Sequence, residues 1–190
     1  IVQPFRSVSQ EVACDKALGQ MKDPMQQSAM TLAVEGAQDW WEVEALYDLC
    51  FAPGRSALSS YRLREGVDPI AGLCLTARDN DGILAGAVRN WPVRIGSADV
   101  VLLGPIAVHP TRQGEGVGSF LMQACLGRAR DGGWARIMLV GDAPYYQRYG
   151  FEVLNGVAMP PPTNPQRVLG IALRDGAWDG VTGAVAAARD

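Results

Sequence analysis

The hydrophobic pattern of the chain first becomes regular near Thr31, since residues 1–29 mix polar, apolar and charged positions without a sustained period. We therefore interpret 1–29 as an N-terminal arm or extension. Residues 31–35 predict a short strand, and Asp39 is a candidate N-cap for the helix that follows. The apolar face of this helix would carry Val43, Leu46, Tyr47 and Cys50, and Pro53-Gly54 would end it.

Residues 56–65 predict a second, more polar helix that stops at Gly66. Two aliphatic segments, 70–78 and 83–95, then flank the turn sequence Asp79-Asn80-Asp81-Gly82 and predict an antiparallel hairpin. A continuous apolar run over 100–108 predicts a strand buried on both faces. Because a regular central strand does not tolerate the Gly104-Pro105 inside this run, we expect a β-bulge there.

The second half of the chain adds two helices and three strands. Residues 116–131 predict an amphipathic helix ended by Gly132-Gly133, and its apolar face would carry Val117, Phe120, Leu121, Ala124 and Cys125. A buried strand over 136–140 precedes a short helix that opens near Pro144 and stops at Gly150. Strands are also expected over 151–154 and 167–173.

This order of elements predicts an α/β (α+β) fold, in which helices flank a mixed sheet that combines a hairpin with a strand-helix-strand unit. We assign one domain to residues 30–175. The Ala/Gly-rich segment 176–190 has no clear period and is interpreted as a C-terminal tail.

Composition narrows the function. A net charge of −3 and the lack of a Lys/Arg-rich tract argue against nucleic acid, and no apolar run approaches the roughly eighteen residues of a membrane-spanning helix. The single histidine and four widely spaced cysteines argue against a metal site and a disulfide framework. No signal peptide is visible, so we expect a cytoplasmic protein.

The candidate chemistry lies in residues 108–119, which join a predicted strand to a predicted helix. Gly114, Gly116 and Gly118 would let backbone N–H groups approach a ligand at a helix start, an arrangement suited to phosphate or pyrophosphate. The spacing fits neither the mononucleotide nor the dinucleotide loop. A glycine-rich turn that only packs the helix against the sheet is the alternative.

The same segment resembles the acyl-CoA-binding motif Q/R-x-x-G-x-G/A of the GNAT (GCN5-related) N-acetyltransferases, with Gln113, Gly116 and Gly118 at the defined positions. Residues 143–151 resemble the A-x-x-Y-x-x-x-G-F signature of that family. Residues 53–55, 61–65 and 140–146 further resemble a bacterial branch of predicted acetyltransferases. The likeness extends over about three quarters of the chain and implies a GNAT-like, mostly antiparallel sheet with splayed parallel strands at the acyl-CoA site.

The resemblance implies acetyl-CoA as co-substrate, with no metal. The backbone of Ile106, Ala107 and Val108 would run beside the pantetheine arm, and the Val108 amide would polarise the thioester carbonyl. Arg112 either adds charge or is a surface arginine. The pyrophosphate would be held by the loop residues Gln113, Gly114, Glu115, Gly116, Val117, Gly118 and Ser119.

By the same resemblance, Tyr146 is the general acid that protonates the departing thiolate, and Tyr145 is the alternative. The general base stays open between Glu65, Asp142 and a water chain, with His109 as a further candidate that is more readily explained as a surface residue. Cys125 lies in the apolar stripe of its helix, so we expect a packed core thiol rather than a nucleophile.

The sequence thus predicts an acetyl-CoA-dependent N-acetyltransferase in which a primary amine attacks the thioester directly within a ternary complex. The acceptor would be a small molecule or a peptide. A non-catalytic acyl-CoA-binding or sensing module, and an interaction protein that binds a partner through its first thirty residues, are the competing hypotheses. A homodimer also stays open.

Overall fold

The computed structural model describes residues 30–51, 55 and 59–189. The predicted arm over 1–29 and the predicted helix end at Pro53-Gly54 lie outside the described residues. No helix in the described part is long and apolar enough to cross a membrane.

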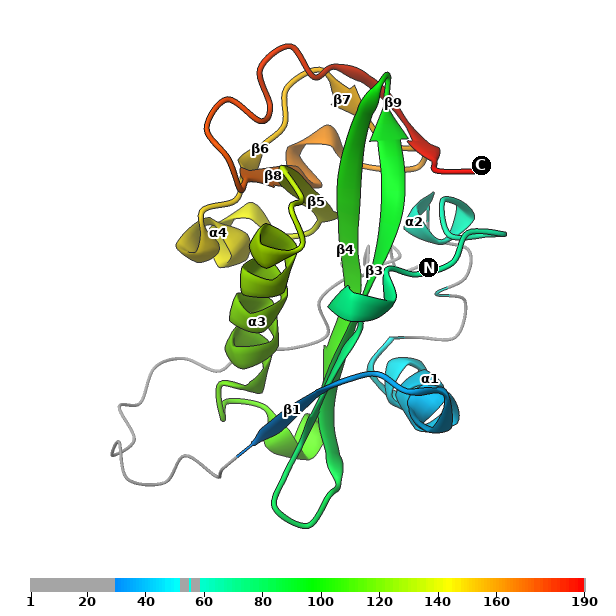
Figure 1. The fold of residues 1–190 in the computed structure, drawn as a ribbon, viewed down its shortest axis with the longest axis vertical. Coiled ribbons are helices and arrows are strands. Elements are labelled where there is room, and N and C mark those ends of the chain that lie inside the picture. The colour runs from blue at the N-terminus through cyan, green and yellow to red at the C-terminus, as the bar shows by residue number, and fades with distance from the viewer. Residues whose placement is uncertain (1–29, 52–54, 56–58, 190) are drawn as a thin grey trace, which may run out of the picture.

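The described secondary structure consists of nine strands, four α-helices and several short 3-10 helices (Figure 1). The strands are β1 (Thr31–Val34), β2 (Leu75–Arg78), β3 (Leu84–Ile95), β4 (Ala98–Val108), β5 (Arg136–Val140), β6 (Glu152–Val153), β7 (Val157–Ala158), β8 (Val168–Ala172) and β9 (Gly183–Ala187). The α-helices are α1 (Trp40–Cys50), α2 (Ser59–Arg62), α3 (Val117–Asp131) and α4 (Ala143–Tyr146). The 3-10 helices are Ala37–Asp39, Ala71–Leu73, Pro110–Arg112, Gln147–Tyr149 and Pro165–Arg167.

The sheet has the strand order β1-β2-β3-β4-β5-β8-β6, and only the β4–β5 pair in this order is parallel. Strand β9 pairs antiparallel with β3 and parallel with β7. The long β3–β4 hairpin runs along the length of the molecule (Figure 1). These pairings confirm the predicted mixed, mostly antiparallel sheet flanked by helices.

Helices cover both faces of the sheet. Helix α3 packs against β2, β3 and β4, whereas α1 packs against β3 and β4 from the opposite side (Figure 1). Strand β4 serves both faces by alternation: Val101 and Leu103 belong to the cluster under α3, and Leu102 belongs to a separate cluster. Past the bulge, Ala107 packs in the cluster formed with α1. This double burial explains the continuous apolar run.

The predicted β-bulge is confirmed. Asn90 pairs with Leu103 and Val88 pairs with Ile106, so β4 advances three residues where β3 advances two. The extra residue falls in the Gly104-Pro105 step. A bulge leaves one residue out of the hydrogen-bond ladder and bends its strand. The bend in β4 allows this strand to separate from its other neighbour, β5.

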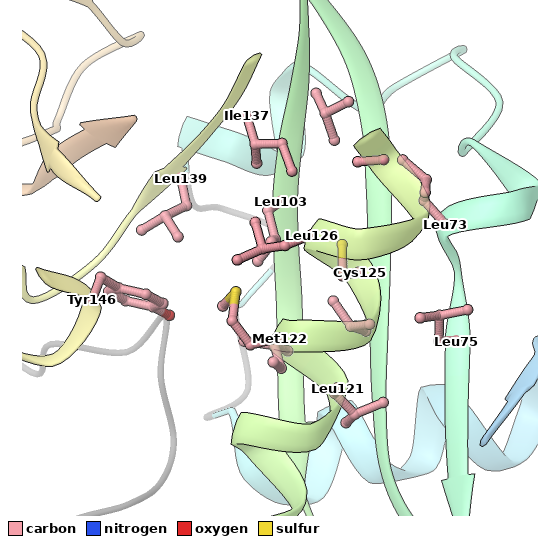
Figure 2. Close-up of a cluster of buried hydrophobic side chains, with 14 of the residues drawn as sticks. Leu73, Leu75, Leu103, Leu121, Met122, Cys125, Leu126, Ile137, Leu139 and Tyr146 are labelled. Atoms are coloured by element: carbon pink, nitrogen blue, oxygen red, sulfur yellow. The ribbon is translucent and has the colours of Figure 1, made fainter. Parts of the chain in front are cut away.

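Helix α3 confirms the predicted helix, but part of its predicted face is wrong. Phe120 is 38% exposed, whereas Met122 and Leu126 are buried with Leu121 and Cys125 (Figure 2). The buried positions follow the i, i+1, i+4, i+5 spacing of one helical stripe, and Phe120 lies beside that stripe. The prediction placed Phe120 on the buried face because it is large and apolar and lies at the edge of the buried stripe.

Three further segments differ from the expectations. Within the predicted helix 56–65 the described α-helix is a single turn, α2, and the start of the predicted strand 70–78 forms the 3-10 helix Ala71–Leu73. The predicted tail contributes β9 to the sheet. Asp39 directly precedes α1 without capping it, because its carboxylate accepts the Gly36 amide at 2.8 Å.

Candidate functional site

The candidate site is a slot between β4 and β5. The two strands pair only at Val101↔Ile137 and Leu102↔Met138. Beyond these positions lies a small pocket that is partly open to solvent. Its described lining residues come from both faces of the sheet and are Phe51, Ser60, Tyr61, Arg64, Leu102, Leu103, Gly104, Pro105, Ile106, Leu139, Val140 and Tyr146.

The first wall of the slot is the main chain of β4 after the bulge. The His109 amide donates to the Ala85 carbonyl at 2.8 Å, so this residue faces β3. Peptide groups alternate in direction along a strand, and the amides of Ile106 and Val108 therefore point away from β3, toward the slot. The family resemblance implies that the pantetheine arm binds along this edge of β4.

Two side chains of α1 hold this wall from behind. The Tyr47 hydroxyl donates to the Pro105 carbonyl at 3.2 Å, and the Cys50 thiol donates to the Val108 carbonyl at 3.3 Å. Burial raises the pKa of Tyr47 well above its usual value, so the phenol stays a donor. Hydrogen bonds from α1 thus hold the bulged segment of β4 in addition to the hydrogen bonds between β3 and β4.

The glycine loop follows β4 directly. Gly114 and Gly116 have φ angles of +81° and +82°, and a Cβ built on either would meet no heavy atom within 4 Å. Gly116 precedes α3, whose first bond runs from the Phe120 amide to the Gly116 carbonyl at 2.9 Å. The amides of residues 117–119 lie before that bond at the positive end of the helix dipole. The amides at the start of α3 therefore lie beside a loop whose glycines leave space for a ligand.

The side chains of the loop differ in their surroundings. Gln113 and Glu115 are exposed, whereas Val117, the first residue of α3, is buried. The Ser119 hydroxyl lies 2.8 Å from the Tyr149 hydroxyl. Gly118 is buried at the start of α3, where an added Cβ would meet the Tyr145 hydroxyl and Val108 at 3.5 Å.

Arg112 belongs to the scaffold. It pairs with Asp79, whose side chain is only 3% exposed, and with Glu115 at 3.6 Å. The Asp79 carboxylate also accepts the amides of Asp81 and Ile83 at 3.0 and 2.9 Å. Arg112 thereby ties the glycine loop to the turn between β2 and β3.

The second wall of the slot is Tyr146, which is 2% exposed and lines the pocket. Its ring packs edge-on against Tyr145 and Phe151, with centroids 5.0 and 5.8 Å apart. Figure 2 shows the ring reaching from α4 toward Met122 of α3. A phenol held this way has one orientation relative to β4.

Gly141 sets the position of the Tyr146 ring. The sequence analysis did not assign Gly141 to the site. A Cβ at Gly141 would clash with Cε2 of Tyr146 and lie 3.1 Å from Leu139, so a side chain there would displace the Tyr146 ring. The available signal was a glycine directly between a buried strand and the Pro144 helix.

Tyr145 and Tyr149 lie on the α3 side of Tyr146. The guanidinium of Arg148 lies 4.0 Å from the ring centroid of Tyr145 and 4.9 Å from that of Tyr149. Burial, followed by the neighbouring Tyr149, raises the pKa of Tyr145 to about 12. Tyr145 does not line the pocket, so the geometry separates the two candidate acids.

The opening toward α1 and α2 contains residues that the sequence did not assign to the site. Ser60, Tyr61 and Arg64 line the pocket from this side. The Arg64 guanidinium stacks between two aromatic rings, 4.4 Å from the centroid of Tyr61 and 4.7 Å from that of Trp91. Ser60, Tyr61 and Arg64 are close in the sequence, and 61–65 is one of the segments that carry the family resemblance. Trp91 lies on β3, so the stacking around Arg64 could not be predicted from the local sequence.

The candidate bases lie outside the described pocket lining. Asp142 pairs with Arg167 at 3.3 Å and is half exposed, and Glu65 is exposed. Nδ1 of His109 lies 2.8 Å from the Thr111 hydroxyl, in keeping with a residue of the scaffold. Cys125 is fully buried, and burial raises its pKa to about 12, which confirms a packed core thiol. Among the described residues no cluster of three or more His, Cys, Asp or Glu could hold a metal ion.

Comparisons with known proteins identify the family of this fold. Residues 71–153 match the family model of the acetyltransferase (GNAT) domain. The uncharacterized N-acetyltransferase YhbS of Escherichia coli K12 is 31% identical over 126 residues, which cover 65% of this chain and 74% of that protein.

Two solved structures share the fold. The crystal structure of YhbS from Escherichia coli in complex with CoA has a TM-score of 0.74 and 28% identity, covering 88% of this chain and 93% of that one. A GNAT family acetyltransferase from Brucella melitensis in complex with acetyl-CoA has a TM-score of 0.62 and 27% identity, covering 84% and 96%. The chain therefore belongs to the GNAT family of N-acetyltransferases.

Proposed function

We propose that this acetyltransferase moves the acetyl group of acetyl-CoA to a primary amine by direct attack within a ternary complex. The observation that carries the proposal is the slot between β4 and β5, where backbone amides form one wall and the Tyr146 ring forms the other. Residues from both faces of the sheet line the slot, and we propose that the two substrates meet in it from opposite sides.

Acetyl-CoA fits the side that faces α3. When bound, it supplies an acetyl group activated as a thioester, together with a pyrophosphate and an amide-bearing arm. The open loop around Gly114 and Gly116 and the first amides of α3 suit the pyrophosphate. The CoA and acetyl-CoA bound to the two similar solved structures support acetyl-CoA as the donor.

The amides of Ile106 and Val108 suit the rest of the donor. Edge amides can bind an amide-bearing arm as a strand binds its neighbour. The Val108 amide would donate to the thioester oxygen as negative charge develops there, a contact that strengthens in the transition state. Cys50, bonded to the Val108 carbonyl, keeps this peptide group oriented.

Tyr146 would donate its hydroxyl proton to the departing sulfur. A phenol of pKa about 10 is a suitable donor to a thiolate as it forms. Among the three tyrosines of residues 143–151, Tyr146 lines the described pocket, whereas Tyr145 and Tyr149 do not line it. Packing against Gly141 and Phe151 fixes the ring before the substrates arrive.

The acceptor would attack as a neutral amine. An ammonium of pKa about 10.4 costs about 4.6 kcal/mol to deprotonate at pH 7, so the proton must leave the amine before or during attack. Since the described pocket lining contains neither a carboxylate nor a cysteine, we propose loss of this proton to water and no covalent enzyme intermediate.

The test is Tyr146→Phe, which keeps the ring and removes the hydroxyl. We expect acetyl-CoA to bind within a few-fold of wild type while kcat falls by about 10²-fold, the lower end for losing a general acid. Calorimetry with acetyl-CoA and thiol release with an amine panel give the two readouts. Tyr145→Phe and Tyr149→Phe are the matched controls and should be nearly silent.

Wild-type turnover in Tyr146→Phe, with chemistry shown to limit the rate, would contradict the assignment. A large loss in Tyr145→Phe would move the acid by one residue. Acetyl-CoA binding without thiol release for any amine would instead favour a sensing module.

A further inference from the structure

The side chains of the glycine loop supply no free positive charge for a pyrophosphate. Within loop 113–119 the one charged side chain is Glu115, which pairs with Arg112 at 3.6 Å. Arg112 also pairs with Asp79, so one arginine faces two carboxylates here. Phosphate groups bind most strongly where charged donors supplement backbone amides. A cation from outside the loop would therefore strengthen binding at this place.

Arg148 is a cation in a suitable position. Its side chain is exposed, and its guanidinium lies 4.0 Å from the ring centroid of Tyr145 and 4.9 Å from that of Tyr149. Cation–π contacts with two rings restrict the side chain. Within the described residues no carboxylate pairs with Arg148, whose charged neighbourhood consists of these two tyrosines.

The same two tyrosines reach the start of α3. The Tyr149 hydroxyl lies 2.8 Å from the Ser119 hydroxyl, and a Cβ built on Gly118 would lie 3.5 Å from the Tyr145 hydroxyl. Gly118 and Ser119 are the second and third residues of α3, and their amides precede its first helical hydrogen bond. Arg148 is therefore separated from the proposed pyrophosphate donors by the width of one aromatic ring.

The tyrosines hold Arg148 without neutralising it. Burial raises the pKa of Tyr145 to about 12, so this phenol is neutral near pH 7 and leaves the guanidinium its full charge. A planar guanidinium suits a phosphate because it donates two parallel hydrogen bonds and is always charged. The arrangement thus presents a positioned fork with one side in solvent.

We propose that Arg148 donates hydrogen bonds to the pyrophosphate of acetyl-CoA and so makes the enzyme prefer this donor over a pantetheine thioester without phosphates. This inference rests on the proposed function, because it concerns the same acetyl donor. The fork would approach the phosphates from the 3-10 helix Gln147–Tyr149, while backbone amides contact them from the start of α3. Arg148 supplies the positive charge that the loop itself lacks.

The experiment compares three acetyl donors. Acetyl-CoA has both the pyrophosphate and the 3′-phosphate, 3′-dephospho-acetyl-CoA keeps the pyrophosphate, and acetyl-pantetheine has neither. Calorimetry gives the affinities of the first two, and ligand-observed NMR gives that of the third. In Arg148→Met, which keeps an apolar stem over the rings, the first two should bind about tenfold more weakly, the lower end for a hydrogen bond to a charged group. Acetyl-pantetheine should change by less than about twofold.

Two further variants and a salt series complete the test. Arg148→Lys keeps the charge without the fork and should lie between wild type and Arg148→Met. Arg130→Met is the matched control, because it removes the same charge from an exposed position in the last turn of α3, at the far end from the loop. It should bind all three donors as wild type does. The difference between wild type and Arg148→Met should shrink at about 1 M salt, which screens an exposed ionic contact but not a packing defect.

Each other outcome overturns a definite part of the argument. Wild-type acetyl-CoA affinity in a folded Arg148→Met protein, or equal losses in Arg148→Met and Arg130→Met, would remove Arg148 from the donor site. A loss for acetyl-CoA alone would assign Arg148 to the 3′-phosphate instead of the pyrophosphate. Equal losses for all three donors, unchanged by salt, would mean a packing role. Failure of the wild-type protein to bind acetyl-CoA would instead overturn the proposed function.

Discussion

The two sides of the slot are built from different parts of the polypeptide. On the donor side, which we define as loop 113–119 with the amides of Ile106 and Val108, the chemistry comes from the main chain. On the acceptor side, defined by Tyr61, Arg64 and Trp91, it comes from side chains stacked across distant segments. The two sides of the slot thus offer a ligand two different kinds of group.

This difference has a physical consequence. Main-chain donors depend on backbone shape, so substitutions that alter φ angles or fill the space above the loop should disturb the donor side. Side-chain recognition changes with a single residue. The donor side is therefore suited to an invariant ligand, and the acceptor side can change its preference without change to the fold.

The largest expected effect concerns the ion pair of Arg89 and Glu35. The side chains of Arg89 and Glu35 are 9% and 8% exposed. Arg89→Met would leave the Glu35 charge buried without this partner, and breaking such a pair costs about 3–5 kcal/mol. We expect urea unfolding to show a loss of that size in the free energy of unfolding.

Two variants sharpen this measurement. Arg94→Met removes an exposed pair, with Arg94 and Asp99 at 57% and 66% exposure, and should cost less than about 1 kcal/mol. Adding Glu35→Gln to Arg89→Met removes the buried charge and should recover part of the loss. Similar losses in Arg89→Met and Arg94→Met would mean that burial of the pair contributes nothing.

The next effect tests the donor side. Gly116→Val places a β-branched side chain at a φ of +82° and above the open face of the loop, so acetyl-CoA affinity should fall by about 100-fold or more, which is about 2.7 kcal/mol. Gly118→Val adds bulk at the buried start of α3 and should also abolish binding. Calorimetry gives the affinities, and circular dichroism reports whether each variant is folded.

Gly82→Val is the matched control, because Gly82 also has a positive φ, of +78°, and open space around it, but lies in the turn between β2 and β3. It should share the backbone strain without the loss of affinity. Wild-type affinity in a folded Gly116→Val protein would refute the loop assignment.

The donor side was predictable from the sequence because its requirements are local. Three glycines at alternate positions between a strand and a helix encode a backbone shape, and the run 100–108 with Gly104-Pro105 encodes a bulged central strand. A strand, Pro144 and Gly150 predicted the short helix that carries Tyr146, whereas the choice of Tyr146 within that helix came from the family resemblance.

The acceptor side was not predictable because its signals are long-range. Arg64 acquires its position from Tyr61, one turn away, and from Trp91 on another strand. Strand β9 was missed because its Ala/Gly-rich sequence has no period, and it forms on an edge supplied by Val93 to Ile95 of β3. In both cases the structure depends on a partner that the local sequence does not encode.

The smallest effect tests how the shared wall of the slot is positioned. In Gly141→Ala the new Cβ would clash with the Tyr146 ring, which is buried and must shift. A small misplacement of a general acid is costly, and we expect kcat to fall by about tenfold while acetyl-CoA affinity stays within a few-fold. Gly127→Ala in α3, where a Cβ meets nothing within 4 Å, should leave kcat unchanged and add up to about 1 kcal/mol of stability.

A double-mutant cycle decides whether Gly141 acts through the Tyr146 hydroxyl. If it does, Gly141→Ala should lower kcat about tenfold in the wild-type background and have little effect once Tyr146→Phe has removed the proton donor, because residues in contact couple in such cycles. A strictly structural role predicts the same tenfold loss in both backgrounds. Equal losses would therefore leave Gly141 as a packing residue and remove it from the explanation of how the acid is aimed.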